Sequence, residues 1–259
     1  MTNSILPEIL NSGKENSTAI SIPDKFNVSY SELKALVSET SEKLNDFGTI
    51  NEKPIVIVLR NNAEFIISFL GVTNTNSIAA PLNPEFTDEE FKFYLDDIQP
   101  SLVITTDDHK VINEARSKNI PVCIISYSDK KLSLSFEGKL SGNNDTNKPT
   151  NNNSCLFLHT SGTTSRPKGV PLKHKNLLKS LDNIVNTYEL SEQDIAMVVM
   201  PLFHVHGLIG VALSTLASGG EIVIPEKFSA SAFWKIQKDY NATWYSAVPT
   251  IHQILLLRA

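Results

Sequence analysis

The chain has 259 residues, of which 41% are hydrophobic and 20% are charged. These values fall in the range of globular proteins, and they exclude a disordered, collagen-like or disulfide-framework chain. With 23 Lys and Arg residues against 28 Asp and Glu residues, the net charge is −5. This acidic balance gives no electrostatic footprint for nucleic acid or for an anionic lipid surface.

Targeting signals and cysteines both favour an intracellular protein. Residues 1–14 show no basic segment followed by an apolar core, so we predict no signal peptide. The longest apolar stretch, residues 208–217, has about half the twenty residues that a membrane-spanning helix needs. Cys123 and Cys155 each lie in an apolar run, which favours buried, reduced thiols. We therefore predict a soluble protein; the sequence does not determine its oligomeric state.

Helical and strand patterns alternate along the first half of the chain. Apolar residues at helical spacing, or in continuous runs of strand length, predict each element. Gly48 is expected to cap the first helix, and Thr87 with Glu90 forms a capping box before the third. In chain order we expect a helix at 31–47, a strand at 54–59, a helix at 63–72, an apolar segment at 77–80 closed by the turn Pro81-Leu82-Asn83-Pro84, a helix containing Phe91 to Ile98, and strands at 102–104 and 122–125.

Between Ser141 and Asn153 asparagine is frequent and apolar residues are almost absent, which predicts a surface linker. The alternation then resumes, with a strand at 195–200, a helix at 208–216, a strand at 221–224, a helix at 230–240, a strand at 243–247 and a helix from Pro249. This alternation predicts an α/β fold with doubly wound, mostly parallel sheets.

The pattern also suggests how the chain is divided. We expect a first α/β subdomain at 1–140, a linker at 141–153, and a second, incomplete subdomain at 154–259. The last helix carries several apolar residues and stops at Arg258-Ala259 without a capping residue. We therefore expect the chain to be a truncated part of a larger domain.

The segment Leu156 to Val170 carries the clearest chemical signal. An apolar strand runs into small and hydroxyl residues, whose backbone N–H groups can converge on an anion, and Lys168 adds a positive charge. The spacing of a Walker loop fails, because Pro167 precedes Lys168 and Gly169 follows it. By composition alone, an ordinary Ser/Thr/Gly turn between two strands remains the alternative to a phosphate-binding loop.

The order of residues in this segment resembles a known signature. Thr160-Ser161-Gly162-Thr163-Thr164-Ser165-Arg166-Pro167-Lys168-Gly169 is similar to T-S-G-T-T-G-x-P-K-G of the adenylate-forming enzymes (acyl-CoA synthetases, luciferases and adenylation domains), with Ser165 in place of the second Gly. Further segments resemble other blocks of that family in the same order: Ala80-Pro81-Leu82-Asn83-Pro84, Met200-Pro201-Leu202-Phe203-His204-Val205-His206-Gly207-Leu208 and Val248-Pro249-Thr250. Within the family, the chain looks most like oxalate–CoA ligases of fungi and plants, including the peroxisomal coenzyme A synthetase type of yeasts.

This resemblance implies the N-terminal part of an AMP-binding domain, in an ATP-dependent acid–CoA ligase with Mg²⁺ as cofactor and coenzyme A as co-substrate. Lys168 and His204 are the catalytic residues that it implies, and His204, His206 and Gly207 would contact the carboxylate substrate. The residues that it assigns to ATP phosphates are Thr160, Ser161, Gly162, Thr163, Thr164, Ser165 and Lys168.

The two histidines of the second block point to the acid. A second carboxylate on the substrate needs a donor or a positive charge, and imidazole can supply either, so a small dicarboxylate is expected. The resemblance to oxalate–CoA ligases implies that this acid is oxalate. No His, Cys and Asp residues have the spacing of a zinc site, so we predict no protein-bound metal.

Other interpretations stay open at this point. The acid could be a medium- or long-chain fatty acid or a 4-coumarate-type substrate. The chain could instead be a non-catalytic nucleotide-binding module, or a phosphotransferase with an unusual loop. The family's later motifs lie beyond Ala259, so we expect this chain alone to be inactive, and a cytoplasmic and a peroxisomal location are both compatible with it. We interpret His159, His174 and His252 as structural, and the pairs Asp96-Asp97 and Asp107-Asp108 as solvated faces or caps.

Overall fold

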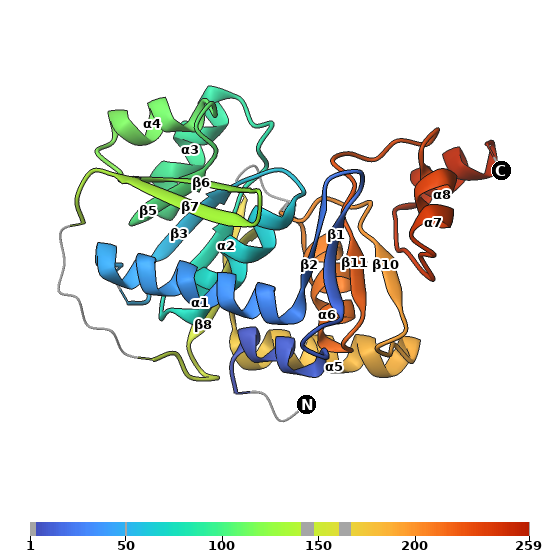
Figure 1. The fold of residues 1–259 in the computed structure, drawn as a ribbon. Coiled ribbons are helices and arrows are strands. Elements are labelled where there is room, and N and C mark those ends of the chain that lie inside the picture. Colours follow the sequence, from blue (N-terminus) through green and yellow to red (C-terminus); the bar gives the residue numbers. More distant parts are fainter. Residues whose placement is uncertain (1–3, 50, 141–147, 161–166, 259) are drawn as a thin grey trace.

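The structure, a computed structural model, describes residues 4–49, 51–140, 148–160 and 167–258. Its strands form two sheets, and helices pack against both of them (Figure 1). The larger sheet has seven strands in the order β7-β6-β5-β3-β4-β8-β9, and the smaller has four in the order β10-β11-β1-β2. Most neighbouring strands are parallel, and the predicted α/β class with mostly parallel sheets is confirmed.

The strands of the larger sheet are β3 (Pro54–Val58), β4 (Ile78–Pro81), β5 (Leu102–Thr105), β6 (Val122–Ser128), β7 (Lys131–Glu137), β8 (Ser154–Thr160) and β9 (Lys168–Lys173). Those of the smaller sheet are β1 (Thr18–Ile22), β2 (Phe26–Ser29), β10 (Ile195–Met197) and β11 (Glu221–Val223). The helices are η1 (Leu6–Ser12), α1 (Tyr30–Phe47), α2 (Ala63–Asn74), α3 (Asp88–Ile98), α4 (Val111–Ser117), α5 (His174–Tyr188), η2 (His206–Leu213), α6 (Ser214–Ala217), α7 (Phe233–Asp239) and α8 (Pro249–Leu256).

Strand β3 shows why a continuous apolar run becomes a central strand. Ile55 and Ile57 face the larger apolar core, which also contains residues of α1 and α2. Val56 and Val58 point the other way, into a smaller core formed with α3 and α4. All four side chains are fully buried, because helices cover both faces of the sheet.

Local signals define the helix ends as the sequence indicates. The Thr87 side chain accepts a hydrogen bond from the Glu90 N–H at 3.3 Å, and the Glu90 carboxylate accepts one from the Thr87 N–H at 2.7 Å. This capping box starts α3 at Asp88. Gly48 ends α1 with φ of 96°, a left-handed conformation that glycine adopts without strain. Both predicted helix ends are confirmed.

Long-range pairing crosses the predicted linker. Strand β1 lies parallel to β11, with Ile20 opposite Ile222, and β8 lies parallel to β4. Each sheet therefore combines strands from both sides of residues 141–153, of which 141–147 lie outside the described residues. The division into subdomains at this point stays a prediction.

Three predicted elements differ in the structure. The strand expected at 195–200 ends at Met197, as β10. The strand expected at 243–247 is reduced to one bridge between Trp244 and Ala196, because the chain turns away where the His206 ring contacts Ser246 and the His252 ring contacts Tyr245. The helix expected at 208–216 is a π-helix from His206 to Leu213 that continues into α6. Hydrophobic spacing alone cannot distinguish a π-helix from an α-helix, since both bury the same apolar run.

The cysteines and the described helices agree with the compositional reading. Cys123 and Cys155 are buried and unpaired, and burial raises the pKa of each thiol to about 12. Within the described part of the chain, no helix is long and apolar enough to cross a membrane.

His174 connects the first turn of α5 to the N-terminal helix η1. Its Nδ1 accepts a hydrogen bond from the Leu6 N–H at 2.9 Å, and only 1% of the residue is exposed. Burial lowers the pKa of His174 from 6.5 to about 4. The structural role expected for this histidine is therefore supported by its contacts.

This pKa shift predicts a loss of stability in acid. Below pH 6.5 the unfolded chain protonates His174, whereas the folded protein keeps it neutral until about pH 4. The free energy of unfolding should therefore fall between these two pH values, by about 1.4 kcal/mol per unit of pKa difference, and then level off. Denaturant unfolding at a series of pH values measures this, with His174→Asn as the comparison, since its side-chain oxygen can still accept from Leu6. An equally steep fall in the variant would contradict the assignment.

Candidate active site

The hairpin of β8 and β9 carries the ends of the predicted phosphate-binding segment. Thr160 and Lys168 lie opposite each other at the end where the chain passes from β8 to β9, and the Thr160 hydroxyl is 3.4 Å from the Lys168 carbonyl oxygen. Lys168 is exposed and takes part in none of the ion pairs formed by the described residues. Its ammonium group is therefore available to an anion. The remaining predicted phosphate ligands, Ser161, Gly162, Thr163, Thr164 and Ser165, lie outside the described residues.

The block around His204 is held against the end of β3 by Asn61. The Asn61 amide donates a hydrogen bond to the Met200 carbonyl oxygen at 3.0 Å, and its side-chain oxygen accepts one from the Leu202 N–H at 2.8 Å. Sequence reasoning missed this residue. The only signal for it in the sequence was an Asn in the short connection between a predicted strand and a predicted helix. An Asn in such a place usually caps the helix or forms a turn, and it seldom holds a distant segment.

His204 follows this clamp on an exposed turn. Its N–H donates to the Pro201 carbonyl oxygen at 3.2 Å, and its ring lies 4.4 Å from that of Phe203. Partial desolvation lowers the pKa of His204 below its ordinary value. The neutral ring is thus favoured near pH 7, so it can donate or accept one hydrogen bond at the surface where the resemblance expects the acyl group.

His206 begins η2, and one of its two ring nitrogens is held by a hydrogen bond. Its Nε2 lies 2.8 Å from the Ser246 hydroxyl, whereas its Nδ1 has no hydrogen-bond partner in the described part of the chain. A side chain at Gly207 would come within 2.3 Å of the Pro201 carbonyl oxygen, so the close approach that starts η2 requires glycine. Ser246 was not foreseen, because forty residues separate it from His206.

The hairpin end lies at one edge of the larger sheet, and Asn61 joins the segment before His204 to the same edge. Strands β3, β4 and β8 are parallel, and Asn61 follows the carboxyl end of β3 just as Thr160 ends β8. In open α/β sheets, ligands bind outside the carboxyl ends of the strands. The structure thus places Thr160 and Lys168 at this edge, and through Asn61 it attaches the segment that leads to His204 and His206.

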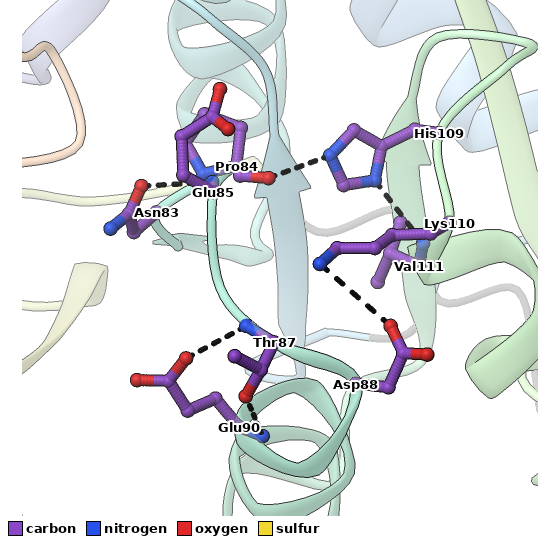
Figure 2. Close-up of polar contacts among 9 residues, drawn as sticks. All are labelled: Asn83, Pro84, Glu85, Thr87, Asp88, Glu90, His109, Lys110 and Val111. Atoms are coloured by element: carbon purple, nitrogen blue, oxygen red, sulfur yellow. Dashed lines mark hydrogen bonds and ion pairs between the residues drawn. The ribbon is translucent and has the colours of Figure 1, made fainter.

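Figure 2 shows how the loop after β4 is fixed at the same edge. The Nε2 of His109 lies 2.9 Å from the Pro84 carbonyl oxygen, and the Val111 N–H donates to its Nδ1 at 3.2 Å. Because Nδ1 accepts, Nε2 carries the hydrogen and donates to Pro84. Burial lowers the pKa of His109, which favours this neutral form. His109 therefore joins the loop after β4 to the loop after β5.

A cavity of about 490 Å³ opens beside this histidine, between the ends of β3 and β5. Strand β3 lies between β4 and β5 in the sheet, so the next two strands along the chain lie on its opposite sides. The cations lining the cavity are already paired: Arg60 with Glu85 at 2.9 Å, and Lys110 with Asp88 at 3.8 Å. The residues present therefore give the cavity no free cation for an anionic ligand.

A family model described as AMP-binding enzyme matches residues 11–259. The chain belongs to this family. The resemblance to adenylate-forming enzymes, stated from the motifs, is confirmed by this match over nearly the whole chain. Among the described residues, no group of three or more His, Cys, Asp or Glu could hold a metal ion.

Curated relatives of this AMP-binding chain include two named oxalate–CoA ligases. The protein from Arabidopsis thaliana is 42% identical over 93% of this chain and 48% of its own length. The protein from Saccharomyces cerevisiae is 33% identical over 93% of this chain and 51% of its own length. The chain therefore spans about half the length of these relatives.

Solved structures share the fold. Apo MatB from Rhodopseudomonas palustris superimposes with a TM-score of 0.84 at 22% identity, covering 99% of this chain and 51% of that chain. ATP-bound MatB from the same organism gives a TM-score of 0.84 at 23% identity, over 98% and 51%. At such identities the likeness shows that this AMP-binding chain has their fold.

Proposed function

We propose that the protein to which this chain belongs is an ATP-dependent acid–CoA ligase that activates a small carboxylate, with oxalate as the substrate. The observation that supports the proposal is the position of Lys168 opposite Thr160 at the carboxyl end of β8, near the edge to which Asn61 joins the segment before His204. The relatives named oxalate–CoA ligase, at 42% and 33% identity, support the choice of acid.

The first requirement of the reaction is that the site neutralises the charge of the reactants. A carboxylate oxygen attacks the α-phosphorus of ATP and displaces pyrophosphate, so an anion must approach an anion. The free ammonium of Lys168 and the hydroxyl of Thr160 would hold phosphate oxygens and offset part of that repulsion. Mg²⁺, when bound, would neutralise further phosphate charge, and in the absence of a protein-built cluster among the described residues it would be held through the nucleotide.

The second requirement is recognition of the acid. His206 offers Nδ1 toward a ligand while Ser246 holds Nε2, so the ring is oriented before the substrate arrives. In the second step of the reaction, the thiol of coenzyme A attacks the acyl carbon and displaces AMP. His204, on the neighbouring exposed turn, is proposed to orient the reacting carboxylate.

Carboxylate-dependent exchange of pyrophosphate into ATP by the full-length protein tests this function. Exchange stimulated by oxalate, followed by oxalyl-CoA formation, is the expected result. Stimulation by medium- or long-chain fatty acids or by coumarate in place of oxalate would retain the ligase and replace the acid. Transfer of the γ-phosphate to an acceptor, or MgATP binding without exchange, would contradict the ligase assignment.

The 259-residue chain alone is expected to bind MgATP without forming acyl-adenylate. Its relatives are about twice as long, and the exposed Leu256 and Leu257 on the last helix leave apolar surface uncovered. We therefore also expect low solubility. Size-exclusion chromatography and a pyrophosphate-release assay measure both properties. A monomeric chain that releases pyrophosphate with oxalate would contradict this prediction.

We place the protein inside the cell, in the cytoplasm or in peroxisomes. The buried, unpaired cysteines support a reducing compartment. Imaging of a tagged full-length protein distinguishes the two locations.

A further inference from the structure

His159 lies directly before the predicted phosphate-binding segment and is held by a carboxylate from another element. Its side chain is 7% exposed, and its Nε2 lies 2.8 Å from Oδ2 of Asp97 on α3. Because an ionised carboxylate only accepts hydrogen bonds, Nε2 is the donor. Tyr94, one turn earlier on α3, meets the same ring edge-on at 4.8 Å. One face of α3 thus holds the histidine by a charge and a ring.

A side chain of the hairpin itself, Phe157, packs against the same end. The ring of Phe157 meets that of His159 edge-on at 5.3 Å. It also lies where a side chain at Gly169 would be, since a Cβ there would come within 2.2 Å of the Phe157 ring. Gly169 is the register partner of His159 and the chain neighbour of Lys168. The position of Lys168 is therefore linked through the backbone to the ring that Asp97 holds.

This end of the hairpin has little other support. Strand β8 pairs with β4 at one position, Ala79 with Leu156, and β9 is an edge strand that pairs with β8. The pairs His159 with Gly169 and Thr160 with Lys168 therefore project past the paired part of the sheet. A two-stranded ribbon without further neighbours is only marginally stable in water. Contact with α3 supplies what the sheet does not.

We propose that Asp97 and His159 are a positioning pair, which anchors to α3 the end of the hairpin where β8 leads to β9, and so fixes Thr160 and Lys168 for phosphate binding. The inference rests on the proposed function for its ligand. It gives the structural role expected for His159 a specific form, and it adds a partner to Asp97, whose side chain is 46% exposed. Neither residue touches the phosphates; both act through the backbone of the hairpin.

The neighbouring carboxylate provides a matched control. Asp96 lies on the same turn of α3 but pairs with Lys118 of the segment after α4. Asp96→Ala removes the same charge from the same helix without touching His159. Asp97→Asn keeps an oxygen that accepts from Nε2, and therefore tests whether the anchor or the charge matters. Since Asp97 is 46% exposed, its replacement should not prevent folding.

The experiment measures the MgATP affinity of the full-length protein by isothermal titration, and the amide hydrogen exchange of the peptides that contain Thr160 and Lys168 by mass spectrometry. Asp97→Ala should weaken MgATP binding about three- to tenfold, in keeping with the partial loss of one charge-assisted hydrogen bond, and should speed exchange in both peptides. Asp96→Ala and Asp97→Asn should stay within about twofold of the unchanged protein. Rescue by Asn distinguishes anchoring from a general loss of acidic charge.

Equal affinity and equal exchange in Asp97→Ala and Asp96→Ala would overturn the inference. A loss in Asp97→Asn as large as that in Asp97→Ala would also overturn it, because the anchor would then not be the cause. Failure of the unchanged protein to bind MgATP would instead count against the proposed function. In that case, faster exchange in Asp97→Ala would still support the anchor itself.

Discussion

Replacing Lys168 with Ala in the full-length protein is expected to weaken the use of MgATP by about 10- to 1,000-fold, since a charged phosphate contact is worth a few kcal/mol. Lys168 lies at the end of the hairpin where β8 leads to β9. It is exposed and forms no ion pair among the described residues. None of the carboxylates in the described ranges is paired with its ammonium group, and we therefore expect its charge to be available to the nucleotide. Pyrophosphate exchange at a series of ATP concentrations measures the effect.

Lys173 offers the matched control. It ends the same strand and lies opposite Ser154, at the far end of the hairpin from Thr160. Lys173→Ala removes an equal charge from β9. It should leave the KM for ATP within about twofold of its original value, because salt screens the interaction between a distant charge and the bound nucleotide. Unchanged exchange in Lys168→Ala would remove this residue from the phosphate site. An equal loss in both variants would point to the overall charge of the strand.

Local signals in the sequence predict much of the larger sheet and of the helices that cover it. The run from Ile55 to Val58 is buried on both faces, and the pattern of one residue in each core follows from the two-residue repeat of a strand. The capping box of Thr87 and Glu90 starts α3 where it was expected. Such features depend on residues within a few positions of each other, so a single sequence contains them.

Pairing between distant segments could not be predicted in the same way. Strand β1 lies beside β11 because both present apolar residues to a shared core, and the sequence does not say which strand each will join. Strand β7 was missed although Leu132, Leu134 and Phe136 alternate with polar residues. That alternation is a usable signal for an antiparallel edge strand.

The candidate site shows the same division. Its motif residues were recognisable because their order is unusual, and Lys168 and Thr160 do lie together. The residues that orient them come from elsewhere: Asn61 beside Leu202, Asp97 beside His159 and Ser246 beside His206. Each is an ordinary polar residue in its own segment. Its role arises only when folding brings the two segments together.

His206→Phe is expected to lower activity on oxalate by at least about tenfold and to improve the use of larger monocarboxylates. Phenylalanine keeps the ring volume at the start of η2 but removes both nitrogens, so a second carboxylate on the substrate loses its donor while an apolar acid gains contact area. The pocket would then reject oxalate because a buried carboxylate without a partner is costly. A panel of acids in a pyrophosphate-release assay, with kcat/KM for each, measures the change in preference.

Two further variants separate the hydrogen bond from the ring. Ser246→Ala leaves His206 in place but frees its Nε2, whereas Ser246→Thr keeps a hydroxyl at the same position. If orientation of the imidazole matters, Ser246→Ala raises the KM for oxalate several-fold, the KM for ATP stays unchanged, and Ser246→Thr restores the former value. If His206→Phe retains its preference for oxalate, His206 does not recognise the second carboxylate. The choice of acid would then have to come from residues other than His206.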